Sequence, residues 1–254
     1  MSGIITRRHL VSGLAIGSGA LLSGCDRLGE SQGFRNLLTL GERGNFAIQR
    51  SLQDRMGLAR EFSPEQMSPV FRANGTRMPE GSAYADHVSS NFANWRLVID
   101  GLVARPQSFT MAQIQSMPAR TQITRHDCVE GWSAIGKWTG VPLKLLLDAA
   151  GLRSGARYVV FHCADMMSAQ SPFYESIDLI DAFHPQTIMA WRLNDSPLSV
   201  PNGAPIRLRV ERQLGYKQAK YVSRIEAVHS LDGVHGGKGG YWEDGAGYEW
   251  YAGI

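Results

Sequence analysis

Cysteine is scarce in this chain, and that scarcity limits how the fold can be stabilised. The three cysteines among 254 residues are Cys25, Cys128 and Cys163. Cys25 ends a short apolar run near the N-terminus, so the remaining two allow one disulfide at most, too few for a disulfide-rich scaffold. The chain must therefore bury a hydrophobic core, and its 43% hydrophobic and 19% charged residues are an ordinary composition for a globular protein.

The net charge gives little reason to expect a nucleic acid partner. The formal charge is only +3 at pH 7, and part of the basic excess comes from Arg7 and Arg8 near the N-terminus. A nucleic-acid-binding surface needs a stronger basic patch than this. We therefore expect no nucleic acid partner.

Residues 1–24 predict a signal peptide. Arg7 and Arg8 precede the apolar run 10–22, which is shorter than the ~20 residues of a membrane span but suits the apolar part of an export signal. The arginine pair resembles a twin-arginine signal, which exports proteins that have already folded around a cofactor. The alternative is an ordinary secretory signal with a fortuitous arginine pair.

The sequence Leu22-Ser23-Gly24-Cys25 resembles a bacterial lipobox. In that interpretation Cys25 becomes the lipidated first residue of the mature chain and anchors it in the membrane. The alternative is a simple cleavage site with an incidental thiol. Asp26 resembles the signal that retains lipoproteins on the inner membrane, so we expect the protein on the periplasmic face of that membrane.

The mature chain is expected to form an irregular N-terminal arm over residues 25–69 and a single domain over residues 70–254. Alternating or helical patterns of apolar residues, together with turn and cap residues, predict the elements of this domain. They are a hairpin at 95–103, a helix at 142–150 ended by Gly151, a strand at 158–163, a helix capped by Ser176, and strands at 206–210 and 220–228.

The strand at 206–210 carries two cations on one face. Its sequence IRLRV puts Arg207 and Arg209 on the side opposite the apolar residues. Lys217, Lys220 and Arg224 continue the basic character. Either the cations lie on a solvated strand face, or they bind an anionic cofactor through charge-assisted hydrogen bonds.

Three interpretations compete for Cys128. It is an inert buried thiol, a zinc ligand together with His126, His162 and Cys163, or a thiolate that binds a metal or attacks a substrate beside Arg125. The zinc interpretation has unfavourable spacing, because the adjacent His162 and Cys163 would point to opposite faces of a strand. The residue types alone leave the choice open.

The stretch HDCVEGWSAIGKWTGVPLKLLL, from His126, resembles the core motif of the sulfite oxidase family. The sequences FRAN at 71–74, NGAPIR at 202–207 and LGYKQAK at 214–220 resemble further segments of that family, in the same order. The resemblance implies an α+β molybdopterin-binding domain with mixed β-sheets and flanking helices. The similarity is greatest to bacterial single-domain enzymes of the methionine sulfoxide reductase type.

The resemblance also implies roles for individual residues. Cys128 would ligate molybdenum held by one molybdopterin, with Arg125 beside the metal as a catalytic residue. The residues implied to bind the cofactor are Asn74, Arg77, Cys163, Asn202, Arg207, Gln218, Ala219 and Lys220. Of these, Cys163 replaces a threonine of the reductase, and sulfur is a poorer hydrogen-bond partner.

The expected function is oxygen-atom transfer by an exported oxidoreductase, in the direction of S-oxide reduction. Sulfite is an anion, and binding it beside an anionic metal centre requires several cations. Near Cys128, however, Arg125 and Lys137 are offset by Asp127 and Glu130. Electrons would come from a membrane cytochrome b or a soluble cytochrome c. The alternatives are a sulfite oxidase or dehydrogenase and, from another class, a zinc-binding lipoprotein without enzymatic activity.

Replacing Arg7 and Arg8 together with lysine should leave a folded, cofactor-loaded precursor in the cytoplasm, because the twin-arginine route reads that pair. Cell fractionation and cofactor analysis of the retained protein measure this. Unimpaired export of the double variant would support the ordinary secretory route instead.

Overall fold

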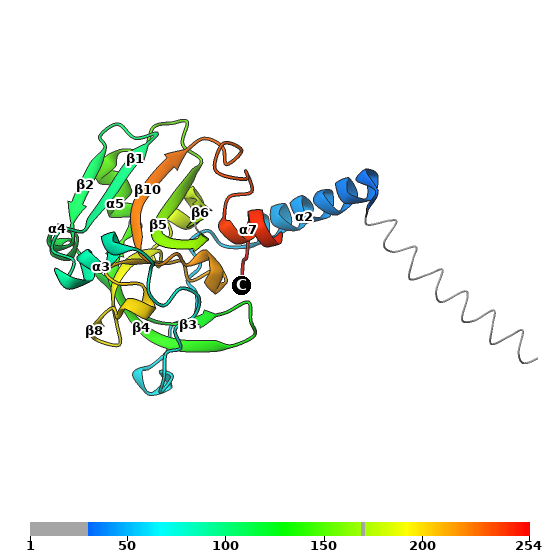
Figure 1. Cartoon of the computed structure of the whole chain (residues 1–254). Helices are drawn as coiled ribbons and strands as arrows, with labels where there is room; N and C mark the ends of the chain where they lie inside the picture. The colour runs from blue at the N-terminus through cyan, green and yellow to red at the C-terminus, as the bar shows by residue number, and fades with distance from the viewer. Residues whose placement is uncertain (1–29, 169–170) are drawn as a thin grey trace, which may run out of the picture. The chain divides into compact units, whose positions relative to one another are not determined.

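A computed structural model describes residues 30–168 and 171–254 (Figure 1). The predicted signal peptide and Cys25 lie outside the described residues, so both stay predictions. No helix of the described part combines the length and the apolar character that crossing a membrane requires. The chain divides into two compact units, Met1–Asp54 and Arg55–Ile254.

In the first unit, residues Gln32–Leu52 form one long helix, α2. The irregular arm expected over 25–69 was therefore wrong for these residues. Ser31 caps the helix by accepting a hydrogen bond from the amide of Phe34. Three glycines, Gly33, Gly41 and Gly44, obscured the helical pattern in the sequence, since glycine costs up to about 1 kcal/mol relative to alanine in a helix.

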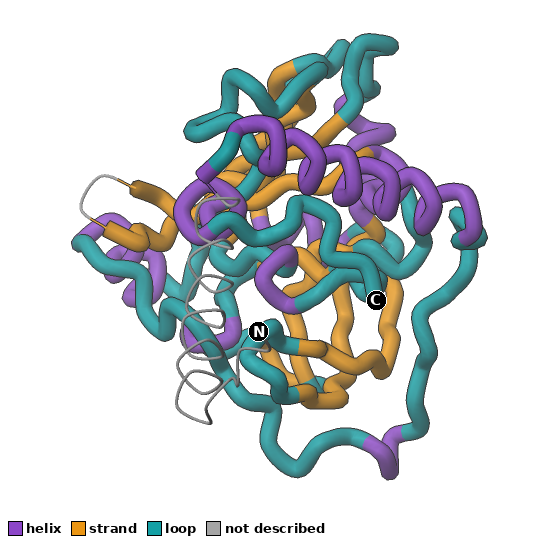
Figure 2. The backbone as a smooth tube through the Cα atoms, turned by 90° about the vertical axis from the view of Figure 1, so that its right-hand side faces the viewer, coloured by secondary structure: helices purple, strands orange, loops and turns teal. Residues whose placement is uncertain are grey.

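The second unit contains two β-sheets (Figure 2). The first has the strand order β2-β1-β10-β5-β6, in which β1 and β10 are parallel and the other pairs are antiparallel. The second is antiparallel, with the order β3-β4-β7-β8 and with β9 also paired to β7. The strands are β1 Arg96–Gly101, β2 Gln107–Thr110, β3 Arg120–Asp127, β4 Ser133–Pro142, β5 Tyr158–Ser168, β6 Ser171–Asp178, β7 Ile188–Leu193, β8 Ser196–Pro197, β9 Arg207–Arg209 and β10 Val222–Val228.

The helices of this unit are short and lie between or beside the strands. They are α3 Ser82–Ser89, α4 Met111–Ser116, α5 Leu143–Ala150, α6 Leu179–Ala182 and α7 Tyr241–Ala246, with 3-10 turns η1 Pro64–Gln66, η2 Val200–Asn202 and η3 Gly215–Lys217. The expected α+β class with mixed sheets and flanking helices is confirmed.

Two of the predicted elements were placed incorrectly. Residues 95–103 do not form a hairpin, because β1 runs straight through Asp100 to Gly101 and pairs in parallel with β10. A Cβ on Gly101 would lie 2.3 Å from the carbonyl oxygen of Ala227, so this glycine permits close strand approach. Ser176 lies inside β6, and Asp178 caps α6 instead.

Helix α5 joins the two sheets through the core. The sequence predicted it correctly: Pro142 precedes it, and Gly151 ends it in a left-handed conformation with φ of 69°. Leu143, Leu146 and Leu147 are fully buried, and the helix packs against β1 of one sheet and β4 of the other.

The compact unit begins at Arg55, earlier than the boundary expected at residue 70. The reason is that residues before 70 form hydrogen bonds with residues of the compact unit that are distant in sequence. The amide of Phe62 donates to the carbonyl of Ile123 in β3, and the backbone of Ala59 exchanges hydrogen bonds with the side chain of Gln186.

Lys217 of η3 is completely buried between two carboxylates. Its ammonium donates to Glu175 of β6 and to Glu243 of α7. The ion triad therefore fastens the C-terminal helix and the 3-10 turn to the first sheet.

Lys217→Met should lower the free energy of unfolding by about 3–5 kcal/mol, because it leaves two buried carboxylates without a counter-ion. Urea denaturation measures this. The matched control is Lys144→Met, since Lys144 pairs with Asp148 at the surface of α5, and an exposed pair contributes about 0.5 kcal/mol or less. Equal losses in both variants would contradict the structural role of the triad.

Candidate functional site

A cavity of about 390 Å³ opens where chain segments distant in sequence meet. Its wall is built from the segment 71–76, the end of β3 and the loop that follows it, residues of β5 and β6, the segments around η2 and η3, and the C-terminal segment. The lining residues used below are Asn74, His126, Cys128, Trp132, Asp165, Asn202, Arg207, Gly215, Gln218, Lys220, Trp242 and Tyr248. A second hollow of about 530 Å³ shares residues 71–75, Pro201 and Asn202 with the first.

Cys128 stands at the cavity because a tight turn follows β3. Its amide donates to the carbonyl of Trp132 at 2.9 Å, and its carbonyl accepts from the amide of Gly131 at 3.0 Å. Gly131 adopts a φ of 84°, which favours glycine. The thiol is partly exposed, and the side-chain amide of Asn74 donates to its sulfur at 3.4 Å. The structure thus presents a free thiol with one oriented donor.

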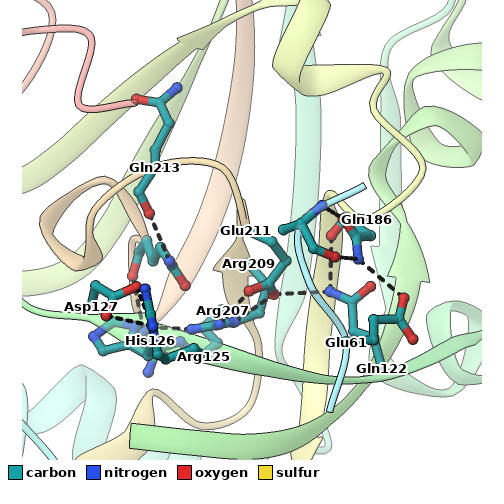
Figure 3. Close-up of polar contacts among 12 residues, drawn as sticks. Glu61, Gln122, Arg125, His126, Asp127, Gln186, Arg207, Arg209, Glu211 and Gln213 are labelled. Carbon is teal, nitrogen blue, oxygen red and sulfur yellow. Dashed lines mark hydrogen bonds and ion pairs between the residues drawn. The ribbon is translucent and has the colours of Figure 1, made fainter. Parts of the chain in front are cut away.

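His126, two residues before Cys128, is held by a buried polar network behind the cavity (Figure 3). Its Nδ1 accepts from the guanidinium of Arg209 at 2.9 Å. Arg209 in turn donates twice to Glu211, at 2.9 and 2.6 Å, and Glu211 accepts from Gln122 at 2.9 Å. Burial, then the charges of Arg209 and Arg207, lower the pKa of His126, so the imidazole is neutral.

The Nε2 edge of the His126 ring lies against Gly215. A Cβ on Gly215 would lie 2.5 Å from Nε2 of His126. Any larger residue at 215 would therefore displace the imidazole. The turn η3 needs its glycine at this position because of that close approach.

Arg207 brings a buried positive charge to the cavity. Its guanidinium donates to the carbonyls of Asn202 at 3.0 Å and Gln218 at 3.1 Å and lies 5.1 Å from the ring centroid of Trp138. Burial and the neighbouring Arg209 lower the pKa of Arg207 to about 9. The solvated strand face that was one interpretation of these arginines is excluded, since their exposed fractions are 5% and 0%.

Lys220 adds a second cation and holds the segment 71–76. Its ammonium donates to the carbonyls of Asn74 at 2.7 Å, Pro201 at 3.0 Å and Thr76. Burial and the charge of Arg207 lower its pKa to about 7. Two cations with depressed pKa values at one cavity favour an anionic ligand, whose charge would raise the pKa of both.

The polar atoms of the wall fit such a ligand. Nε of Arg207 and Oδ1 of Asn202 are buried and have no hydrogen-bond partner among the described residues. Buried polar groups are normally paired, so two unpaired atoms on one cavity wall indicate a bound polar group. A thiolate ligand, cations for a phosphate and unpaired amide and guanidinium groups together match molybdenum held by an anionic pterin cofactor.

Most of the residues predicted from the sequence meet at this cavity. Cys128, Asn74, Asn202, Arg207, Gln218 and Lys220 all line it. Arg77 lines the second hollow instead.

Three predicted residues do not line either cavity. The side chain of Arg125 is 54% exposed and pairs with Asp127. Cys163 is buried in the hydrophobic core, where burial raises the pKa of its thiol. Ala219 is buried, and its carbonyl accepts from the amide of Leu208. Their roles in the site stay predictions without geometric support.

The sequence did not single out several residues of the wall, among them Trp242, Tyr248 and Asp165. Trp242 and Tyr248 come from the C-terminal segment and stack with ring centroids 5.8 Å apart. The aromatic composition of that segment was a signal for a cavity wall. Asp165 is buried within β5, where burial raises its pKa, and nothing in the sequence distinguished it from other acids.

The zinc interpretation of the cysteine and histidine residues fails on geometry. Over residues 30–168 and 171–254, no three histidine, cysteine or acidic side chains converge as metal ligands. His162 instead pairs with Glu226 at 2.9 Å, away from Cys128.

The fold and the cavity are those of a cofactor-dependent oxidoreductase domain. Residues 84–232 match the family model described as an oxidoreductase molybdopterin binding domain. The chain therefore belongs to this family, which includes the sulfite oxidase type of fold, and it is a molybdopterin-dependent oxidoreductase.

Two relatives carry similar sequences. A putative protein-methionine-sulfoxide reductase subunit YedZ1 of Azospira oryzae is 35% identical over 97% of this chain and 87% of the relative. The protein-methionine-sulfoxide reductase catalytic subunit MsrP of Campylobacter jejuni is 32% identical over 65% of this chain and 60% of its own length.

One solved structure has a similar fold. The sulfane dehydrogenase SoxCD of Paracoccus pantotrophus aligns with a TM-score of 0.50 over 54% of this chain and 39% of that chain, at 24% identity. This similarity concerns the fold alone.

In the cofactor-free chain, the free energy of unfolding should rise with pH between about 7 and 9, in part because of Lys220. The unfolded chain keeps this lysine protonated up to its ordinary pKa of 10.5, whereas the folded chain releases the proton near pH 7. Lys220→Met should reduce that slope. Urea denaturation across this pH range measures it, and the control is Lys137→Met, whose lysine pairs with Asp195 at the surface. Identical slopes for the chain and both variants would contradict the depressed pKa.

Proposed function

We propose that this chain reduces S-oxides at the cavity beside Cys128. Bound molybdenum-molybdopterin would supply the oxygen-atom transfer chemistry, and a redox partner would supply the two electrons that, with two protons, convert the transferred oxygen to water. The observation that carries the proposal is the free thiol of Cys128, which lines the same cavity as the buried Arg207 and the half-buried Lys220.

The residues around the cavity would have two separate roles, ligation of the metal and binding of the pterin. Cys128 would hold the metal as a thiolate, and Asn74 donates a hydrogen bond to its sulfur. Arg207, Lys220 and Asn202 would bind the anionic end of the cofactor. Charge-assisted hydrogen bonds of this kind contribute about 1.5–3 kcal/mol each, so they retain the cofactor firmly.

The substrate side of the cavity favours a neutral molecule. The aromatic residues Trp132, Phe173, Trp242 and Tyr248 line it. Aromatic rings contact sulfur groups favourably, and they give no attraction to an anion such as sulfite. The carboxylate of Glu130 also lines the cavity and accepts a hydrogen bond from the indole of Trp132.

The cations close to Cys128 in sequence are already neutralised. Arg125 pairs with Asp127 at 2.8 Å, and Lys137 pairs with Asp195 at 2.7 Å. The guanidinium of Arg72 lines the cavity and lies over the ring of Trp132, 5.4 Å from its centroid. Arg72 is the feature that best suits the alternative, sulfite oxidation.

The names of the two relatives support the reductive direction, since both are described as methionine sulfoxide reductase subunits. The word subunit also supports a separate redox partner. We propose a membrane cytochrome b as that partner, and a soluble cytochrome c as the alternative. The proposed location is the periplasmic face of the inner membrane, with Cys25 as the lipid anchor.

The loaded enzyme should reduce methionine sulfoxide with a reduced dye and should oxidise sulfite poorly with ferricyanide. Cys128→Ala should lower turnover at least about 100-fold while the pterin stays bound, because the contacts to its phosphate lie elsewhere. Steady-state assays in both directions and pterin analysis measure this.

The matched control is Cys163→Ala, since the thiol of Cys163 does not line the cavity. We expect it to keep turnover within about threefold of the unchanged enzyme. Efficient sulfite oxidation without S-oxide reduction would reverse the proposed direction. Full turnover by Cys128→Ala would remove the thiolate from the mechanism.

A further inference from the structure

Helix α2 carries an apolar face that no other part of its own unit covers among the described residues. Leu37 is 62% exposed, Ile48 is 58% exposed and Leu52 is 80% exposed. Leucine and isoleucine at this level of exposure are unfavourable in water, and a row of them on one helix marks an interaction surface.

Five of the seven large apolar residues of α2 gather on one side of the helix, and Leu40 and Phe46 lie outside that side. At 100° per residue, Phe34, Leu37, Leu38, Ile48 and Leu52 fall within an arc of about 100°. Gly41 and Asn45 fall within the same arc, so Asn45 is its one polar side chain. The helix has 21 residues, so at 1.5 Å per residue this face is about 30 Å long.

The rest of the helix is basic. Its sequence contains three arginines and a single glutamate, and Arg35 and Arg50 fall outside the apolar arc. A strongly polar, basic side beside an apolar face is the pattern of helices that lie in the interface of an anionic bilayer. Arginine side chains beside such a face reach the lipid phosphates while their methylene groups stay in the apolar layer.

We propose that α2 binds the surface of an anionic lipid bilayer, with its apolar face in the interface and its arginines among the phosphate groups. Two copies of α2 packed through this face would bring like charges together, so a lipid surface fits the helix better than a second chain. The proposal does not rest on S-oxide reduction or on lipidation of Cys25.

The position of α2 in the chain agrees with this role. Only six residues lie between Cys25 and Gln32, so the two are at most about 25 Å apart at full extension. Only Gln53 and Asp54 separate the end of α2 from the unit that begins at Arg55. A helix bound to the bilayer would therefore hold the oxidoreductase domain close to the membrane surface, where a single lipid anchor would leave it on a longer tether.

The test uses the cofactor-loaded chain without its signal peptide and with Cys25→Ser, so that no lipid can be attached. The protein is sedimented with vesicles of phosphatidylcholine, with or without phosphatidylglycerol. We expect binding to the vesicles that contain phosphatidylglycerol, and weaker binding as salt is added.

The double variant Leu37→Gln with Ile48→Gln should lower the vesicle partition constant at least about tenfold, because it removes two apolar side chains from the buried face. The matched control is Asn36→Gln with Ser51→Gln, which changes two residues outside the apolar arc and should bind as the unchanged chain does. Arg35→Gln with Arg50→Gln should lose the preference for phosphatidylglycerol. Dye-linked turnover should be the same in all these variants.

Three outcomes would overturn the proposal. The first is that the unchanged chain does not bind protein-free vesicles. The second is that the Leu37→Gln, Ile48→Gln variant binds vesicles as strongly as the Asn36→Gln, Ser51→Gln control. The third is self-association in analytical ultracentrifugation that the Leu37 and Ile48 substitutions abolish, which would assign the apolar face to a second copy. Loss of turnover with intact vesicle binding would count against the proposed function alone.

Discussion

The buried pair between Arg209 and Glu211 is the interaction on which the cavity depends. Arg209 is fully buried, yet its charge is balanced by two hydrogen bonds to one carboxylate. It then donates to His126, which fixes the end of β3 just before Cys128. Removing either partner would leave an unpaired charge in the core, a loss of about 3–5 kcal/mol. Stability and the position of the thiol are therefore coupled.

Arg207, on the same strand, differs from Arg209 because its guanidinium is not fully hydrogen-bonded. It faces the cavity, shares the ring of Trp138 with Arg209, and has an Nε without a partner among the described residues. The buried guanidinium therefore lacks one hydrogen-bond partner in the cofactor-free chain, which lowers the stability of the fold. An anionic cofactor would offset that loss by accepting a charge-assisted hydrogen bond. Folding and cofactor binding are linked through this residue and through Lys220, whose pKa is also depressed.

Local patterns in the sequence correctly predicted elements whose ends are set by neighbouring residues in the chain. Helix α5 was found because Pro142 and Gly151 favour its two ends whatever surrounds them. The hairpin at 95–103 was wrong because an Asp-Gly pair favours a turn only when the two flanking segments pair with each other. Here β1 pairs with β10, more than a hundred residues later. The irregular arm was wrong because glycines masked the period of α2.

The sequence alone determined the chemistry available to this protein: one thiol in a recognisable motif, paired cations on an alternating strand, and the family to which these segments belong. Only the tertiary structure decided which of those residues share a cavity. It placed Lys217 in a buried ion triad and Lys220 at the cavity, although both follow the same basic strand. It also kept Cys163 in the core and brought Trp242 to the wall. Spacing along a chain fixes which face of an element a side chain lies on, whereas the contacts of that face depend on the packing of distant elements.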